Sequence, residues 1–187
     1  MQKELIIAGF GGQGVLFAGQ VLAYAAMDSG FEVTWIPSYG PEMRGGTANC
    51  TIVIADEEIG SPLVQHPPYA VALNLPSFDK YEAEMQAGGV LVVNQSMVDR
   101  ISRRTDITCI FIPANEIAEA LGDKKLTNMV AMGAMLACLP ELSLKDVQTA
   151  LSNHLSARHK HLLPKNFEAL QRGCDFAREH LAAQTAS

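Results

Sequence analysis

The sequence predicts an α/β fold in which a Rossmann-like, largely parallel sheet is flanked by helices and followed by a helical C-terminal third. Short apolar runs alternate with helical segments through the first two thirds of the chain, and a glycine-rich turn follows the first run. From residue 127 onward the pattern is only helical. The 187 residues contain no internal repeat and no linker-like stretch, so we expect one domain over 1–187.

The first half of the chain predicts three strands and one helix. Residues 5–8 (LIIA) are an apolar run that suits a strand buried on both faces, and residues 13–27 follow as a helix. Further strands are expected over 31–36 and 48–55, joined by a Gly- and Pro-rich loop over 38–46. Because this loop is short, the second and third strands could pair antiparallel at one edge of the sheet.

The second half continues the alternation and then becomes helical. Strands are expected at 70–75, 90–93 and 108–112, and helices at 78–86 and 115–121 alternate with them. Residues 127–139 carry no charge and predict a buried helix that ends before Pro140. A capping-box pattern at Ser143 and an apolar stripe over 167–181 predict the last two helices.

The charge balance excludes some classes of partner. Lys and Arg number 14 against 20 Asp and Glu, which gives a net charge of -6, and 48% of residues are hydrophobic. This composition is typical of a soluble globular protein and lacks the basic surface that nucleic acid requires, so we expect no nucleic-acid partner. Residues 5–27 carry no charge, but glycines and glutamines interrupt them, so we expect a strand, a turn and a helix rather than a membrane segment. The lack of a targeting segment and of a disulfide pattern favours the cytoplasm.

The sequence carries no convincing motif for a metal site or a catalytic nucleophile. The cysteines, at positions 50, 109, 138 and 174, form no C-x-x-C pair, so local spacing cannot assemble a zinc ribbon or an iron–sulfur cluster. His159 and His161 are flanked by basic residues, without a carboxylate at helical spacing, which is more typical of a solvated turn than of a metal site. We expect no metal site and no catalytic residue in this chain.

The strongest local motif is GFGGQG at 9–14, a G-x-G-x-x-G pattern directly after a strand and at the start of a helix. Glycines allow a tight turn and close backbone approach, and the helix N-terminus offers free N–H groups to a phosphate. The candidate cofactor-binding residues here are Gly9, Gly11, Gly12, Gln13 and Gly14. In the alternative interpretation, these glycines only let the strand and helix pack closely.

A second candidate segment, YGPEMRGG at 39–46, is expected at the carboxyl end of the second strand, beside the glycine turn. Arg44, next to Gly45 and Gly46, could bind a phosphate or carboxylate, and Tyr39 could stack or donate a hydrogen bond. These four residues complete the set of cofactor-binding candidates. The alternative is a solvated loop in which Arg44 pairs with a nearby acid or with an acid of a partner subunit.

An ordinary NAD site is disfavoured. Such a site needs an acid at the end of the second strand to bind the ribose hydroxyls. This sequence has Trp-Ile-Pro-Ser at 35–38, and Glu32 lies at the opposite end of the strand. The turn could still accept a phosphate-bearing group of another kind.

Together, GFGGQGV at 9–15, SYGPEMRGGTANC at 38–50 and IGSP at 59–62 resemble the gamma subunit of 2-oxoacid:ferredoxin oxidoreductases. The resemblance continues more loosely through NMVAMG at 128–133 and through 166–173, so it spans nearly the whole chain. The YGPEMRGG form most resembles gamma subunits of the 2-oxoglutarate type.

The resemblance implies a subunit of a multi-chain enzyme that decarboxylates a 2-oxo acid oxidatively, with coenzyme A, and passes the electrons to ferredoxin. It also implies that alpha and beta subunits hold thiamine diphosphate and that cysteine-rich parts, such as a ferredoxin-like delta subunit, hold iron–sulfur clusters. On this resemblance, residues 9–14 and 39–46 lie near the subunit junction and the approach of coenzyme A. A free-standing nucleotide-binding oxidoreductase and a pure assembly module remain alternatives.

Overall fold

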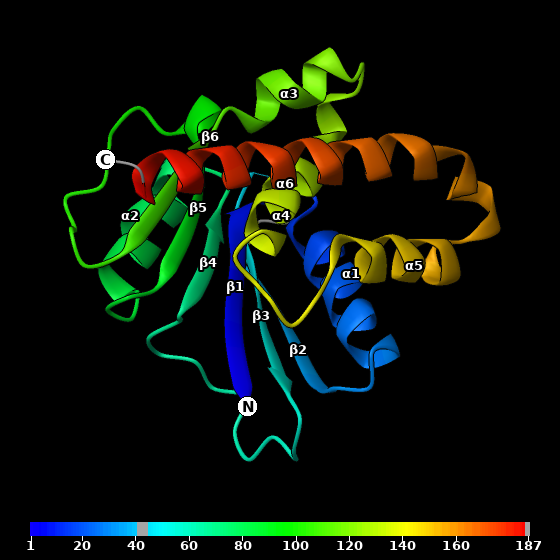
Figure 1. Ribbon diagram of the computed structural model, residues 1–187, viewed down its shortest axis with the longest axis horizontal. Coiled ribbons are helices and arrows are strands. Elements are labelled where there is room, and N and C mark those ends of the chain that lie inside the picture. Colours follow the sequence, from blue (N-terminus) through cyan, green and yellow to red (C-terminus); the bar gives the residue numbers. More distant parts are fainter. Residues whose placement is uncertain (41–44, 186–187) are drawn as a thin grey trace.

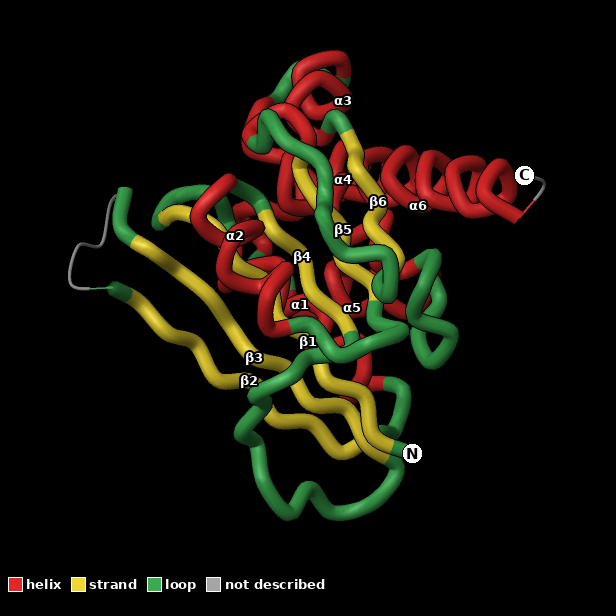
Figure 2. Tube along the Cα trace, turned by 90° about the vertical axis from the view of Figure 1, so that its left-hand side faces the viewer, coloured by secondary structure: helices red, strands yellow, loops and turns green. Residues whose placement is uncertain are grey.

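The computed structural model describes residues 1–40 and 45–185, which form a six-stranded sheet in the order β2-β3-β1-β4-β5-β6 (Figure 1). The strands are β1 (Gln2–Phe10), β2 (Glu32–Tyr39), β3 (Thr47–Ala55), β4 (Tyr69–Ala72), β5 (Val90–Asn94) and β6 (Thr108–Ile112). Figure 2 shows these strands side by side, with β2 at one edge of the twisted sheet. The predicted α/β fold with flanking helices is confirmed.

The sheet contains one reversed strand in the part of the chain that the structure describes. The pairs β1·β4, β4·β5 and β5·β6 are parallel, whereas β3 pairs antiparallel with both β2 and β1. The antiparallel pairing of the second and third strands was predicted, but the insertion of β3 between β1 and β2 was not. Ile52, Val53 and Ile54 are all buried, so β3 is apolar on both faces and suits an interior position, while half-exposed β2 suits the edge.

Helices cover both faces of the sheet. They are α1 (Val15–Asp28), α2 (Leu75–Glu84), α3 (Ala114–Ala120), α4 (Thr127–Leu136), α5 (Leu144–His154) and α6 (Leu163–Thr185). Alternate residues of β1 show the two cores, because Leu5 and Ile7 pack with α1 and α4 whereas Ile6 and Ala8 pack with α2. The run 5–8 is therefore buried on both faces, as predicted.

Helix α4 is buried along its whole length, which confirms the prediction from its uncharged sequence. It lies between the sheet and α6, which crosses it as the long red and orange helix of Figure 1. Among the described helices, none combines the length and the hydropathy needed to cross a membrane.

Several element boundaries differ from the prediction, and three of these differences have a clear physical reason. Helix α1 begins at Val15, because Gly14 has a left-handed backbone with φ of 73°. Strand β2 continues through Pro37, which an edge strand tolerates because one side of it has no neighbour to accept hydrogen bonds. Helix α2 begins inside the apolar run expected as a strand, because the Asn74 side chain accepts the Ser77 N–H at 2.9 Å and caps the helix.

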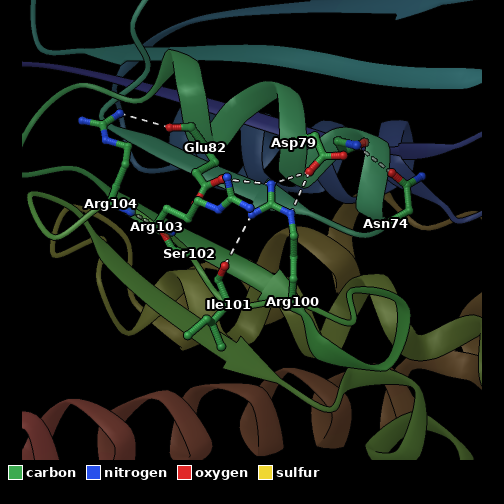
Figure 3. Close-up of polar contacts among 9 residues, drawn as sticks. Asn74, Asp79, Glu82, Arg100, Ile101, Ser102, Arg103 and Arg104 are labelled. Carbon is green, nitrogen blue, oxygen red and sulfur yellow. Dashed lines mark hydrogen bonds and ion pairs between the residues drawn. The ribbon is translucent and has the colours of Figure 1, made fainter.

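The connection between β5 and β6 is fastened to α2 by arginines (Figure 3). Arg100 donates hydrogen bonds to Asp79 and, at 3.0 Å, to Glu82, while the Arg103 N–H donates to Glu82 at 2.9 Å. Arg104 donates to the backbone carbonyl of Glu82 at 3.0 Å. These bonds fix α2, whose first turn borders the carboxyl ends of β1 and β4.

Candidate functional site

The glycine turn connects β1 to α1 in the conformation that its sequence predicts. Gly12 and Gly14 have φ of 100° and 73°, values that residues with a Cβ rarely adopt. A Cβ on Gly14 would also overlap the amide nitrogen of Asn128, which donates to the Gly14 carbonyl at 3.0 Å. Glycine is therefore required at position 14 both by the backbone and by the packing of α4 against the turn.

Hydrogen bonds of the Gln13 side chain connect the turn to the end of the neighbouring strand β4. Its Oε1 accepts the Phe10 N–H at 2.6 Å, and its Nε2 donates to the Leu73 carbonyl at 3.4 Å. Asn74 donates to the same Oε1 at 3.4 Å. The chain leaves β1 toward one side of the sheet and β4 toward the other, so Gln13 bridges the topological switch point at which open α/β sheets bind ligands.

A buried amide network continues from this bridge along the carboxyl edge of the sheet. Asn94 is fully buried and donates to the Leu73 carbonyl at 3.2 Å and to Asn115 at 3.1 Å. Thr127 donates to the same Asn115 oxygen at 3.2 Å. The network joins β4 and β5 to α3 and α4, and it holds this edge of the sheet in one geometry.

The second candidate segment meets the glycine turn. Gly11 donates its N–H to the Gly46 carbonyl at 2.8 Å, and the Gly45 N–H approaches the Gly11 carbonyl at 3.5 Å. Pairing of β3 with β1, with Thr47 opposite Phe10, brings the segments together. The two segments were predicted to be neighbours through the end of the second strand, whereas the third strand makes the contact.

Tyr39 ends β2 and is 54% exposed. Arg44 falls outside the described residues, so its predicted role rests on the sequence. Gly9 lies opposite Ala48 in the β1·β3 ladder, and a Cβ there would lie 3.1 Å from the Leu73 Cβ, so the lack of a side chain at Gly9 allows close packing at this point.

Among the residues that the structure describes, no side chain caps the N-terminus of α1, so the turn presents backbone N–H groups to its surroundings. Two cavities border it. One, of about 380 Å³, is here called the lysine cavity and is lined by Lys125, His159, Lys165, Phe17, Leu155 and Leu162. The other, of about 310 Å³, is called the tyrosine cavity and is lined by Tyr39, Phe10, Gly11, Leu16 and Ala48. Gly12, Gly14 and Phe17 line both cavities.

The lysine cavity was not predicted from the sequence. Lys125 lies in a 3-10 helix (Lys124–Leu126) just before α4, and Lys165 lies in the first turn of α6. His159, which was expected in a solvated turn, is exposed in the 3-10 helix Ala157–Leu162 and also lines the cavity. Segments far apart in the sequence supply these side chains, and no local motif marks them.

Burial disfavours the thiolate form of the cysteines. Burial raises the pKa of Cys50 to about 12 and that of Cys138 to about 11, and it also raises those of Cys109 and Cys174. Among the described residues, no group of three or more His, Cys, Asp and Glu side chains could hold a metal ion.

The fold and this turn define a Rossmann-like α/β domain with one reversed strand beside its ligand-facing edge. The chain belongs to the pyruvate ferredoxin/flavodoxin oxidoreductase family, whose model matches residues 4–176. It is 37% identical over 187 residues to the 2-oxoglutarate synthase subunit KorC of Methanothermobacter marburgensis, covering 96% of this chain and 98% of that one.

A second relative is longer. The ketoisovalerate oxidoreductase subunit VorA of the same organism is 38% identical over 182 residues, which cover 95% of this chain but 37% of VorA. This chain therefore spans little more than a third of the length of its VorA relative and almost all of KorC.

Two solved structures share the fold. The gamma subunit of a keto/oxoacid ferredoxin oxidoreductase from Geobacter sulfurreducens PCA has a TM-score of 0.83 at 28% identity, covering 96% of this chain and 98% of that one. A 2-oxoglutarate:ferredoxin oxidoreductase from Magnetococcus marinus, with 2-oxoglutarate, coenzyme A and succinyl-CoA bound, has a TM-score of 0.85 at 23% identity, covering 95% of this chain and 31% of that one. The predicted resemblance to gamma subunits of this family is confirmed.

Proposed function

We propose that this chain is the gamma subunit of a multi-subunit 2-oxoacid:ferredoxin oxidoreductase of the cytoplasm, with alpha, beta and ferredoxin-like delta subunits as partners. The complex would decarboxylate a 2-oxo acid oxidatively, form the acyl-CoA and reduce ferredoxin. The observation that carries this proposal is the end-to-end match to KorC and to a solved gamma subunit. In VorA the matching part is covalently continuous with a longer chain, which supports permanent contact with other parts of an enzyme.

In this proposal the redox chemistry belongs to the partners. Thiamine diphosphate would be held by the alpha and beta subunits, and the iron–sulfur clusters by the ferredoxin-like part. The raised thiol pKa values of this chain fit a role without covalent catalysis. Its own task would be to complete the assembly and to bind coenzyme A.

The coenzyme A contact is assigned to the glycine turn and to the segment hydrogen-bonded to it. Gly9, Gly11, Gly12, Gln13 and Gly14 would approach the ligand through their backbone, together with Tyr39, Arg44, Gly45 and Gly46. The uncapped N-terminus of α1 and the Gly11–Gly46 hydrogen bond support this assignment, because they gather free donors and both segments at one edge of the sheet.

We propose 2-oxoglutarate as the 2-oxo acid. The YGPEMRGG form and the full-length match to KorC support it, while the equally similar VorA makes ketoisovalerate the second candidate. Measuring the turnover of 2-oxoglutarate and of ketoisovalerate by the purified complex distinguishes the two candidate substrates. Preference for ketoisovalerate would exclude the 2-oxoglutarate assignment but not the family role.

The decisive experiment is purification of the tagged chain from its native cell. Co-purifying subunits with thiamine-binding and ferredoxin-like sequences are expected, and a chain that purifies without them would overturn the proposal. In the purified complex, Arg44→Ala should raise the KM for coenzyme A about tenfold, the effect of one lost charge-assisted contact. Arg172→Ala, at a solvent-exposed pair with Glu168 on α6, is the matched control. An unchanged KM for coenzyme A in Arg44→Ala would favour a pure assembly module.

A further inference from the structure

The outer side of α6 carries a row of charged side chains. The helix packs on α4 through its buried side, and Figure 2 shows its C-terminal end extending away from the sheet. Positions three and four apart lie on one face of a helix. On the exposed face of α6 these positions are Lys165, Glu168, Arg172, Asp175 and Glu179.

The order of the charges makes this row complementary to itself when it is read backwards. Lys165 and Asp175 lie at equal distances on either side of Leu170, and so do Glu168 and Arg172. In two antiparallel helices related by a two-fold axis, residue i meets residue j while j meets i. Turning the row end for end therefore places each of these four charges opposite a charge of the other sign.

The outer charges of the row have no ionic partner within one copy of the chain. Arg172 pairs with Glu168 at 3.4 Å, one turn away. Among the described residues, Lys165 and Asp175 form no ion pair, and the Asp175 carboxylate accepts a hydrogen bond from the neutral Gln171 amide at 2.8 Å. Lys165 and Asp175 are ten positions apart, about 15 Å along the helix, so they can meet only across two copies.

The two ends of the row also differ in charge. The exposed side chains of the 3-10 helix Ala157–Leu162, just before α6, include Arg158 and Lys160, whereas the row ends at Glu179. An antiparallel pair brings the basic end of one copy to the acidic end of the other.

Apolar surface beside the row supplies packing for a second helix. A groove of about 440 Å³ lies between α3 and α6, and Ile117, Leu121 and Phe176 contribute its larger apolar side chains. All three are only partly buried against the core. The aliphatic parts of long charged side chains cover such surface while their charged ends stay at the rim. The groove therefore suits a helix with a charged row like that of α6.

We propose that α6 pairs antiparallel with α6 of a second copy of this chain, across a two-fold axis beside Leu170. Lys165 then contacts Asp175 of the second copy, and Glu168 contacts Arg172 of the second copy. This inference goes beyond the proposed function and does not depend on it. In an assembled oxidoreductase, the pair would join two complexes through their gamma subunits.

Cross-linking of the complex that co-purifies with this chain tests the pairing directly. In Lys165→Cys combined with Asp175→Cys, a short bismaleimide should link two copies of the chain, because each new thiol lies beside the other one on the second copy. The two single variants are the controls, since identical thiols then lie about 15 Å apart along the paired helices. A link to a different subunit would assign this face to that subunit and overturn the proposal.

Charge exchange gives an independent measurement on the purified full chain. Lys165→Glu and Asp175→Lys should each raise the dimer dissociation constant about tenfold, because each variant sets like charges opposite each other at two symmetric contacts. The combined exchange should restore it, which a role within one copy would not do. Sedimentation over a dilution series measures these constants.

Arg178→Glu is the matched control, because Arg178 is exposed on α6 but lies outside the row. It should leave the dissociation constant unchanged. A combined exchange that dimerises no better than the single variants would contradict the contact between Lys165 and Asp175. A full chain that sediments as a monomer, together with no cross-link in the complex, would show that the row faces solvent and would overturn the proposal.

Discussion

A methyl group on Gly173 would overlap the carbonyl oxygen of Val130, so α6 and α4 cross with their backbones in contact. The contact is reciprocal, because a Cβ on Gly133 would overlap the carbonyl of Leu170. The stretches around residues 128–133 and 166–173, which also carry part of the family resemblance, thus have a packing role at this crossing. At this crossing α6 packs against α4, and Asn128 at the start of α4 donates to the Gly14 carbonyl in the glycine turn.

Gly173→Ala and Gly133→Ala should each destabilise the protein. Alanine favours helix by about 1 kcal/mol over glycine, but forcing the two helices apart costs more, typically 1–3 kcal/mol or above. Urea unfolding should therefore show a lower free energy of unfolding for both variants. Gly60→Ala is the control, since no atom of the described residues lies within 4 Å of a Cβ at that position. Variants as stable as wild type would show that α4 and α6 can move apart without lowering the free energy of unfolding.

Gln13→Ala should loosen the glycine turn. It removes the acceptor of the Phe10 N–H and the link to the Leu73 carbonyl, at an expected cost of about 1–2 kcal/mol. Amide hydrogen exchange over residues 10–14 should become faster than in wild type. Gln20→Ala, which removes a side chain from the middle of α1 instead, should leave those rates unchanged. If the amide exchange rates of Gln13→Ala over residues 10–14 equal those of wild type, backbone hydrogen bonds alone hold the turn.

Glu82 should make stability depend on acid pH. Burial by itself would raise the pKa of Glu82, but hydrogen bonds from Ser102, the Arg103 N–H and Arg100 outweigh it and lower the pKa below 4.5. A lowered carboxyl pKa stabilises the fold above the unfolded-state value, and this contribution is lost as pH falls through the folded-state value.

Glu82→Gln should therefore reduce the free energy of unfolding by about 1–3 kcal/mol at pH 7 and reduce its dependence on pH below 5. Asp79→Asn is the comparison variant, because Asp79 also pairs with Arg100. Its carboxylate is 53% exposed, so its effect should stay below about 1 kcal/mol. Identical acid-unfolding curves for Glu82→Gln and wild type would contradict this assignment.

Cys50 should contribute to alkaline instability. Burial raises its pKa to about 12, so the unfolded chain releases this proton near pH 9 while the folded chain retains it. Between these values one such thiol lowers the free energy of unfolding by about 1.4 kcal/mol per pH unit. Unfolding curves at pH 8 to 10.5 should be steeper in pH for wild type than for Cys50→Ala, and parallel slopes would refute the burial argument.

Periodicity and composition were sufficient for much of the fold. The apolar run 5–8, the glycine turn and the uncharged α4 were all identified correctly, because a buried strand, a turn with positive φ and a fully buried helix each impose a local residue pattern. The start of α2 was misjudged, because the Asn74 cap outweighs the apolar run around it. Strand order was not predictable, since the same strands fit several orders.

The candidate site, too, was predictable from the sequence only in part. The glycine turn and the segment after the second strand carry their own motifs, and they were predicted to be neighbours, although β3 rather than the end of β2 makes the contact. Lys125, Lys165 and His159 carry no motif, because isolated cations near helix starts are common in any sequence. They form a cavity only where three helix connections meet.

By itself, the sequence determined that a strand, a glycine turn and a helix begin this protein, since left-handed residues at 12 and 14 require glycine wherever the rest of the chain lies. Only the tertiary structure decided that β3 separates β1 from β2 and carries Gly46 to Gly11. An acid at the end of β2 would thus stand two strands away from the turn, where it could not serve a dinucleotide ribose as in the usual order. The reason is that local conformation depends on neighbouring residues, whereas strand order depends on which surfaces become buried together.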